Sequence, residues 1–125
     1  MTENEISKIN VECALKVHRA PGPGLLENSY EECLAYELKR KELKVEKQKP
    51  LPLIYEDVQL EIGYRIDLLI ESKVIIEIKS VEALNDIHLA QILTYLKLSG
   101  CKLGLLINFN VALIKHGIKR VFNNL

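Results

Sequence analysis

The chain has 125 residues, of which 48% are hydrophobic, and its 17 basic and 17 acidic side chains give a formal net charge of zero at pH 7. This length predicts one domain, residues 1–125, which buries about two thirds of the surface that the unfolded chain exposes. A neutral chain exerts no overall attraction on nucleic acids or membranes, so any such partner must be bound by a local patch.

Targeting and cysteine patterns indicate a cytoplasmic protein without membrane contact. The polar N-terminus, MTENEISKIN, lacks the apolar run of a signal peptide, and no apolar stretch reaches the roughly 18 residues of a membrane span. The three cysteines, Cys13, Cys33 and Cys101, are odd in number and lack the spacing of a metal site. We therefore expect reduced thiols that act as small buried hydrophobes, with catalysis as the less favoured alternative.

The first part of the chain predicts two helices followed by an extended segment. Apolar residues recur at helical spacing over residues 5–18 and 26–42, and the sequence RAPGPG separates the two runs. The apolar stripe of the second helix includes Leu26 and Cys33. Residues 43–57 have an extended pattern, and their two prolines predict an edge strand or an irregular strand.

Strands dominate the second part of the chain. Apolar residues alternate with polar ones over residues 60–70 and 73–80, which predicts two strands. A helix follows an N-cap at Asp86, and a buried strand over 101–109 leads to a short final strand within 113–122. This order predicts an α/β fold in which helices pack on a single mixed sheet of four or five strands.

Charged residues interrupt the apolar pattern of the predicted hairpin, GYRIDLLIESKVIIEIKS. A three-residue turn at 71–73 keeps the apolar faces together, whereas a slip of one residue would move every side chain to the other face. This register sets Asp67 opposite Glu77, with their Cβ atoms about 5 Å apart, and puts Lys79 on the face of Glu77. The two carboxylates repel each other unless they are protonated, paired or bound to a cation, so we expect at least one raised pKa.

Two interpretations of this polar face stay open. Hard divalent cations take oxygen ligands, and the carboxylates of Asp67 and Glu77 with the carbonyl of Ile78 could supply them. Lys79 could then orient water or offset charge during phosphodiester hydrolysis. Alternatively the face is an ordinary solvated surface, on which Arg65 and Lys79 form salt bridges with the two carboxylates.

Two motifs carry a resemblance to a known family. The spacing Asp67-x9-Glu77-x-Lys79 resembles the signature of the PD-(D/E)XK nuclease superfamily, with isoleucine in place of the proline of the motif. The sequence GLLENSY at 24–30 fits Gly-x-x-Glu-x-x-Tyr, and with the order of elements it resembles the GxxExxY family, a branch of that superfamily. The resemblance spans about residues 6–122 and implies a restriction-endonuclease-like core.

The resemblance also implies a function and a site. It implies a nuclease that depends on Mg²⁺ or Mn²⁺ and hydrolyses phosphodiester bonds in nucleic acid, for which we expect DNA. Asp67, Glu77 and Lys79 would be catalytic, and Glu27 and the Ile78 carbonyl would join the two carboxylates as metal ligands. The residues implied for substrate binding are Gln91, Tyr95, Tyr30 and His88. We expect Glu27, Gln91 and Tyr95 to line the same cleft as Asp67, Glu77 and Lys79.

Structural alternatives exist for these residues and for the function. Glu27 could interact only with the helix macrodipole, the tyrosines could be core rings, and His18 and His88 could be structural. Gly24 could serve a turn, and the lysines within 39–49 could be a solvated face rather than a DNA-binding track. The alternative function is a non-catalytic nuclease-fold module that binds nucleic acid or a protein. A homodimer is compatible with the sequence, which does not determine the oligomeric state.

Overall fold

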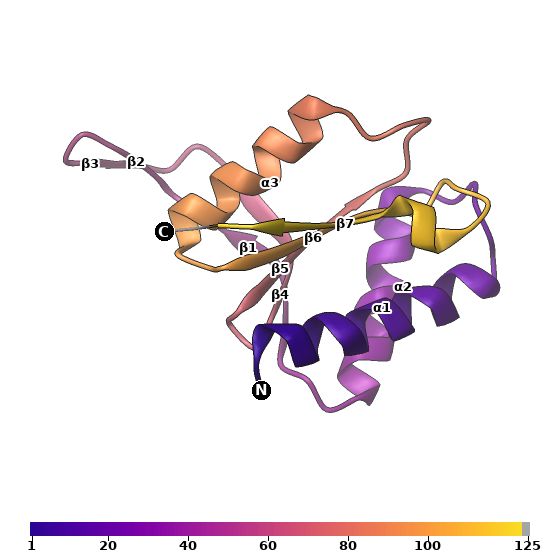
Figure 1. Cartoon of the computed structure of the whole chain (residues 1–125). Coiled ribbons are helices and arrows are strands. Elements are labelled where there is room, and N and C mark those ends of the chain that lie inside the picture. The colour runs from indigo at the N-terminus through magenta and orange to yellow at the C-terminus, as the bar shows by residue number, and fades with distance from the viewer. Residues whose placement is uncertain (124–125) are drawn as a thin grey trace.

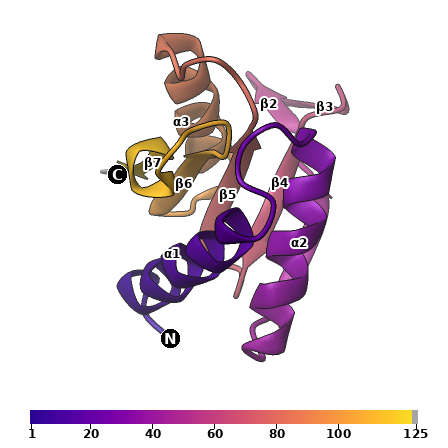
Figure 2. The ribbon, with the colours of Figure 1, turned by 90° about the vertical axis from the view of Figure 1, so that its right-hand side faces the viewer.

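The computed structural model describes residues 1–123. Its elements are α1 Glu3–Arg19, α2 Glu27–Arg40, β1 Val45–Pro50, β2 Leu53–Tyr55, β3 Val58–Leu60, β4 Arg65–Ile70, β5 Val74–Lys79, α3 Asp86–Ser99, β6 Leu103–Asn108, η1 Ile114–Gly117 and β7 Ile118–Phe122. Five strands form a sheet in the order β1-β4-β5-β6-β7, in which β5 and β6 run parallel and the other neighbours antiparallel. Helices α1 and α2 cover one face and α3 the other (Figures 1 and 2). The predicted α/β architecture is confirmed.

Side-chain caps explain where two of the helices begin. At α1, Thr2 and Glu5 form a capping box, each side chain accepting the backbone N–H of the other residue at 3.1 Å. At α3 the N-cap is Asn85, whose extended backbone lets its side chain accept the N–H groups of Ile87 and His88 at 3.0 Å. The predicted cap at Asp86 is therefore wrong by one residue. None of the helices within residues 1–123 is both long and apolar enough to cross a membrane.

The sheet has an apolar core on each face. The core beneath α1 and α2 includes Tyr30, Leu34, Leu38, Leu68, Ile76, Leu105 and Phe109. The core beneath α3 includes Ile66, Leu69, Ile75, Ile92, Leu96 and Leu106. Each fully buried side chain of this size contributes about 1.5–3 kcal/mol to folding. Leu26 and Cys33 are exposed, contrary to the predicted stripe, because Leu26 is the N-cap of α2 and Cys33 faces away from the sheet; Cys13 is buried as expected.

The β4–β5 hairpin has the predicted register. Ile70 pairs with Val74 and Leu68 pairs with Ile76. Glu71 and the residue after it have left-handed backbones, with φ of 52° and 55°, and the N–H of residue 73 donates to the carbonyl of Ile70 at 2.9 Å. The apolar alternation thus selects the register, and the turn adopts the conformation that this register requires.

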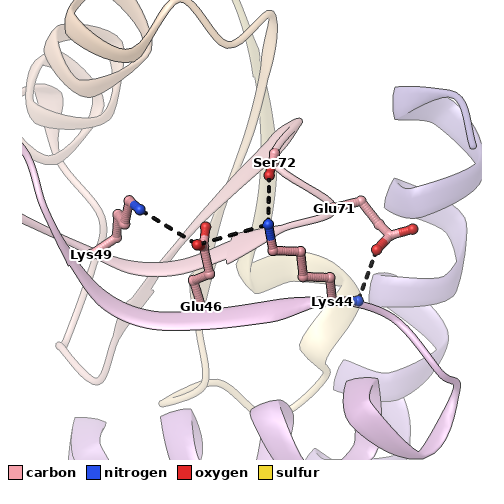
Figure 3. A network of polar contacts seen from close by, with 5 residues as sticks. All are labelled: Lys44, Glu46, Lys49, Glu71 and Ser72. Carbon is pink, nitrogen blue, oxygen red and sulfur yellow. Dashed lines mark hydrogen bonds and ion pairs between the residues drawn. The ribbon is translucent and has the colours of Figure 1, made fainter.

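Polar contacts fix this turn to the start of β1 (Figure 3). The backbone N–H of Lys44 donates to Glu71 Oε2 at 2.8 Å, and its Nζ donates to Ser72 Oγ at 3.4 Å. Glu46 accepts from Lys49 at 3.4 Å and lies 4.0 Å from Lys44 Nζ. The two bonds from Lys44 to the turn are exposed and individually weak, and they add to the backbone ladder between β1 and β4 in holding β1 against the hairpin.

The predicted strand over residues 60–70 is wrong in its first half. Residues 61–64 are irregular, and β3 pairs with β2 as a separate two-stranded hairpin that projects from the main sheet (Figure 1). The turn of this hairpin contains Glu56, whose φ is 55°, and Gly63 has a φ of 78° where the chain returns to the sheet. Side chains of the hairpin, including Ile54, Tyr55 and Val58, are more than half exposed. The apolar alternation continues through this segment although no core receives it.

Candidate active site

Strands β4 and β5 separate at the polar end of the hairpin. Their paired register stops at Leu68 and Ile76, although both strands continue. Beyond that point side chains replace the backbone ladder. The N–H of Asp67 donates to Glu77 Oε2 and the N–H of Ile78 donates to Asp67 Oδ2, both at 2.8 Å. These reciprocal bonds hold the two carboxyl groups side by side in the gap between the strands, as the register predicted.

Burial makes this carboxyl pair unusual. Glu77 is 3% exposed, and burial together with the nearby charge of Asp67 raises its pKa to about 8. Burial also raises the pKa of Asp67, although the Ile78 N–H and the Lys79 charge oppose this. The expected raised pKa is confirmed, with burial rather than charge repulsion as the larger cause. In the absence of a cation, Glu77 therefore favours its protonated form far more than an exposed glutamate does.

The alternative of a solvated salt-bridge surface does not hold. Within residues 1–123, no ion pair joins Asp67 or Glu77 to Arg65 or Lys79. The ammonium group of Lys79 instead donates to Gln91 Oε1 at 3.2 Å. Burying an ionisable carboxyl group reduces the stability of the folded state, whereas carboxylates on an ordinary solvated surface carry no such cost.

Helix α3 forms one wall of the site. The Gln91 side chain accepts from Lys79 and donates to the Tyr95 hydroxyl at 3.1 Å, so the three residues form a continuous chain. Burial raises the pKa of Tyr95, and the charges of Glu77 and Asp67 add to this. The predicted grouping of Gln91 and Tyr95 with Lys79 is therefore present.

Helix α2 borders the opposite side of the site. Glu27, its first residue, accepts the backbone N–H of Ser80 at 3.1 Å, directly after the end of β5. The hydroxyl of Ser80 donates to the carbonyl of Leu25 at 2.7 Å, so the start of the helix is fixed to the strand. Burial is the largest cause of the raised pKa of Asp67, and the charge of Glu27 adds to it.

The comparisons with known proteins agree with this geometry. A family model described as the PD-(D/E)XK nuclease superfamily matches residues 4–121, which is nearly the whole chain. The chain belongs to the PD-(D/E)XK nuclease superfamily. Neither the curated proteins nor the solved structures gave a significant match. The match does not extend to a branch of the superfamily, so the GxxExxY assignment stays a prediction from residues 24–30.

Two of the residues predicted to bind substrate make structural contacts within the fold. Tyr30 is fully buried and stacks on Phe109 with the ring centroids 4.5 Å apart. Its hydroxyl donates to the carbonyl of Gly22 and accepts the N–H of Leu25 at 3.1 Å, so it fixes the loop before Glu27 and cannot touch substrate. His88 completes the cap of α3, because its Nδ1 accepts the N–H of residue 85 at 3.1 Å.

The structural alternatives for His18 and Gly24 also hold. His18 is buried and its Nε2 lies 2.8 Å from the carbonyl oxygen of Val111, and Gly24 has a φ of 105° in the loop before α2. Two lysines of β1 are engaged with carboxylates: Lys47 contacts Glu32 at 2.8 Å, and Lys49 contacts the neighbouring Glu46 as described above. These contacts favour a solvated face over a DNA-binding track.

Three residues of the site were missed by the sequence patterns. Glu31 lies one turn after Glu27 on α2 and is 7% exposed; burial and then the charge of Asp67 raise its pKa. Gln48 of β1 donates to both Glu31 and Asp67. Asn108 ends β6, where its side chain exchanges two hydrogen bonds of 3.0 and 3.1 Å with the backbone after Lys79. For Glu31 the sequence offered one indication: it lies four residues after Glu27, which puts the two glutamates on the same face of α2.

The donor set at the fork fits a hard divalent cation. Asp67 and Glu77 supply carboxylate oxygens, and the Ile78 carbonyl faces the gap because the N–H and C=O of one strand residue point to the same edge. Within residues 1–123, no three or more His, Cys, Asp or Glu side chains are already gathered in metal-binding geometry. Mg²⁺ needs only one or two carboxylates, with water and substrate phosphate completing its shell, so this smaller set suffices.

Proposed function

We propose that the protein is a nuclease that hydrolyses phosphodiester bonds in DNA and depends on Mg²⁺ or Mn²⁺. The observation that carries the proposal is the fork between β4 and β5, where the partly buried Asp67 and the buried Glu77 hold their carboxyl groups side by side, with Lys79 two residues after Glu77 on β5. The membership of the superfamily supports the same chemistry. When bound, the cation would polarise the scissile phosphate and lower the pKa of a water molecule.

The chain's own residues have distinct parts in this proposal. Asp67, Glu77 and the Ile78 carbonyl would hold the cation, and Glu27 would reach it from the start of α2. Glu77 must release its proton to do so, because a cation ligand has to be ionised. Lys79 would donate to a phosphate oxygen or orient the attacking water.

The wall formed by α3 supports a role in positioning. Gln91 accepts from the Lys79 ammonium group and donates to the Tyr95 hydroxyl. Tyr95 therefore fixes the side chain of Gln91, which in turn fixes the ammonium group. Such fixed donors cost little reorganisation when charge develops on the phosphate. We propose Gln91 and Tyr95 as contacts to the substrate backbone near the scissile bond, and assign no such contact to Tyr30 or His88.

A cleavage assay on several nucleic acids tests the proposal. We expect cleavage of double-stranded or single-stranded DNA with Mn²⁺ or Mg²⁺, and none with EDTA. The Glu77→Ala variant should lose at least 100-fold in rate, as in other sites where a principal charge-stabilising group is removed. Cleavage of RNA alone would correct the substrate. Equal activity of the variant and the wild type would show that the nuclease activity comes from elsewhere.

One observation favours the alternative of a non-catalytic module. The β2–β3 hairpin exposes apolar side chains, while its charges, Glu56, Asp57 and Glu61, are all acidic. Such a surface suits a protein partner better than a phosphate backbone. A module of this kind would bind its partner equally well without divalent cations and would cleave none of the nucleic acids in the assay.

A further inference from the structure

The backbone of Gln48 has a conformation that glutamine rarely adopts. Its φ is 51°, in the left-handed region, although it lies in the middle of β1. The neighbours Lys47 and Lys49 pair normally with Leu68 and Ile66, but Gln48 and Asp67 are not paired between them. A left-handed glutamine inside a strand is costly and persists only where the surrounding structure requires it.

The side-chain amide nitrogen of Gln48 bonds to two carboxyl groups of the site. Its Nε2 donates to Glu31 Oε1 at 2.8 Å and to Asp67 Oδ1 at 3.3 Å. Both partners are carboxylates, which accept when ionised, so the amide must present its two N–H groups to them. Glu31 is itself buried on α2, so the amide connects a helix to the strand that carries Asp67.

These bonds fix the orientation of Asp67. Its Oδ2 accepts the N–H of Ile78 and its Oδ1 accepts from Gln48, so both oxygens of the carboxyl group are held. Without Gln48, one oxygen would lose its partner and the charge of Glu31 would face that of Asp67 directly. We interpret the left-handed backbone as the conformation that brings the Gln48 amide to Asp67, so that both features orient the Asp67 carboxyl group.

We propose that Gln48 is a positioning residue, which sets the Asp67 carboxyl group for cation binding by means of its left-handed backbone and its bond to Glu31. The inference rests on the proposed function, in which Asp67 is a metal ligand. Gln48 touches neither substrate nor cation and acts only through Asp67. Loss of the amide should weaken cation binding even where the fold is unharmed.

The Gln48→Gly variant separates the two roles of the residue. Glycine adopts a positive φ without steric strain, and relief of that strain offsets part of the stability that is lost with the two hydrogen bonds. The variant should therefore still fold and unfold in one cooperative transition. Its Mn²⁺ affinity, measured by titration calorimetry, should nevertheless fall about tenfold or more. Gln48→Asn, which tolerates the same backbone but is one methylene too short, should show a similar loss and serves if the glycine variant folds poorly.

Glu56→Gly is the matched control. Glu56 also has a left-handed backbone, with a φ of 55°, but lies at the tip of the β2–β3 hairpin. The Glu56→Gly variant should fold and bind Mn²⁺ like the wild type. Unchanged Mn²⁺ affinity in both Gln48 variants would overturn the positioning role alone. If the wild type itself binds no Mn²⁺, the proposed function fails, and the positioning role fails with it.

Discussion

Replacing Lys79 with alanine is expected to reduce kcat by about 100- to 1,000-fold while leaving Mn²⁺ affinity within about threefold of the wild type. The ammonium group lies at the fork but bonds to Gln91 rather than to either carboxyl group. In the proposed mechanism its removal takes away a group that would interact with the reacting phosphate, and not a ligand of the cation. Single-turnover cleavage kinetics and calorimetry on the same variant measure the two effects separately.

Lys97→Ala is the control for Lys79→Ala, because Lys97 is an exposed lysine in the last turn of α3. It should cleave at the rate of the wild type. Lys79→Arg should recover only part of the lost rate, since a planar guanidinium does not replace a compact ammonium group. A Lys79→Ala variant with an unchanged rate would remove the lysine from the mechanism.

Replacing Glu77 with glutamine is expected to change how stability depends on pH. The folded-state pKa of Glu77 is about 8, above its ordinary value of 4.5, so the folded state binds more protons than the unfolded state between these pH values. Stability of the metal-free wild type should therefore fall as pH rises through this window, by up to about 1.4 kcal/mol per pH unit from this group. Glutamine resembles the protonated form and lacks this dependence.

Urea unfolding at several pH values checks the prediction. The difference between Glu77→Gln and the wild type should be small at pH 4 and should grow to a few kcal/mol in favour of glutamine at pH 8. The exposed Glu61→Gln on the hairpin serves as the control and should parallel the wild type. If the Glu77→Gln curve also runs parallel to the wild type, the carboxyl group is not held in its protonated form by the fold.

The sequence predicted the carboxyl pair correctly because the apolar pattern of the hairpin allows only one strand register. Apolar residues on β4 and β5 can share faces in one register only, and that register brings Asp67 to Glu77. The same reasoning failed for residues 60–64, because Leu60, Ile62 and Tyr64 continue the alternation without a core to receive them. Alternation alone cannot distinguish a strand of the main sheet from a projecting hairpin.

The supporting residues of the site were beyond the reach of sequence patterns. Glu31 lies on a helix rich in charged residues, most of which are solvated, and its burial depends on how α2 packs against the sheet. Gln48 lies in a polar edge strand, and nothing in the sequence indicates a left-handed backbone there. Tyr30 was predicted from its motif, but its full burial and its bonds to the preceding loop follow only from tertiary packing.

The central claim is that Asp67 and Glu77 together bind a divalent cation, and thermal melting with and without Mn²⁺ tests it most directly. A ligand at ten times its Kd stabilises the folded state by about 1.4 kcal/mol, so the melting temperature of the wild type should rise by about 5 °C. Asp67→Ala and Glu77→Ala should show no such rise, although Glu77→Ala should be at least as stable as the wild type without metal. Equal responses to Mn²⁺ in the wild type and in both variants would contradict the claim.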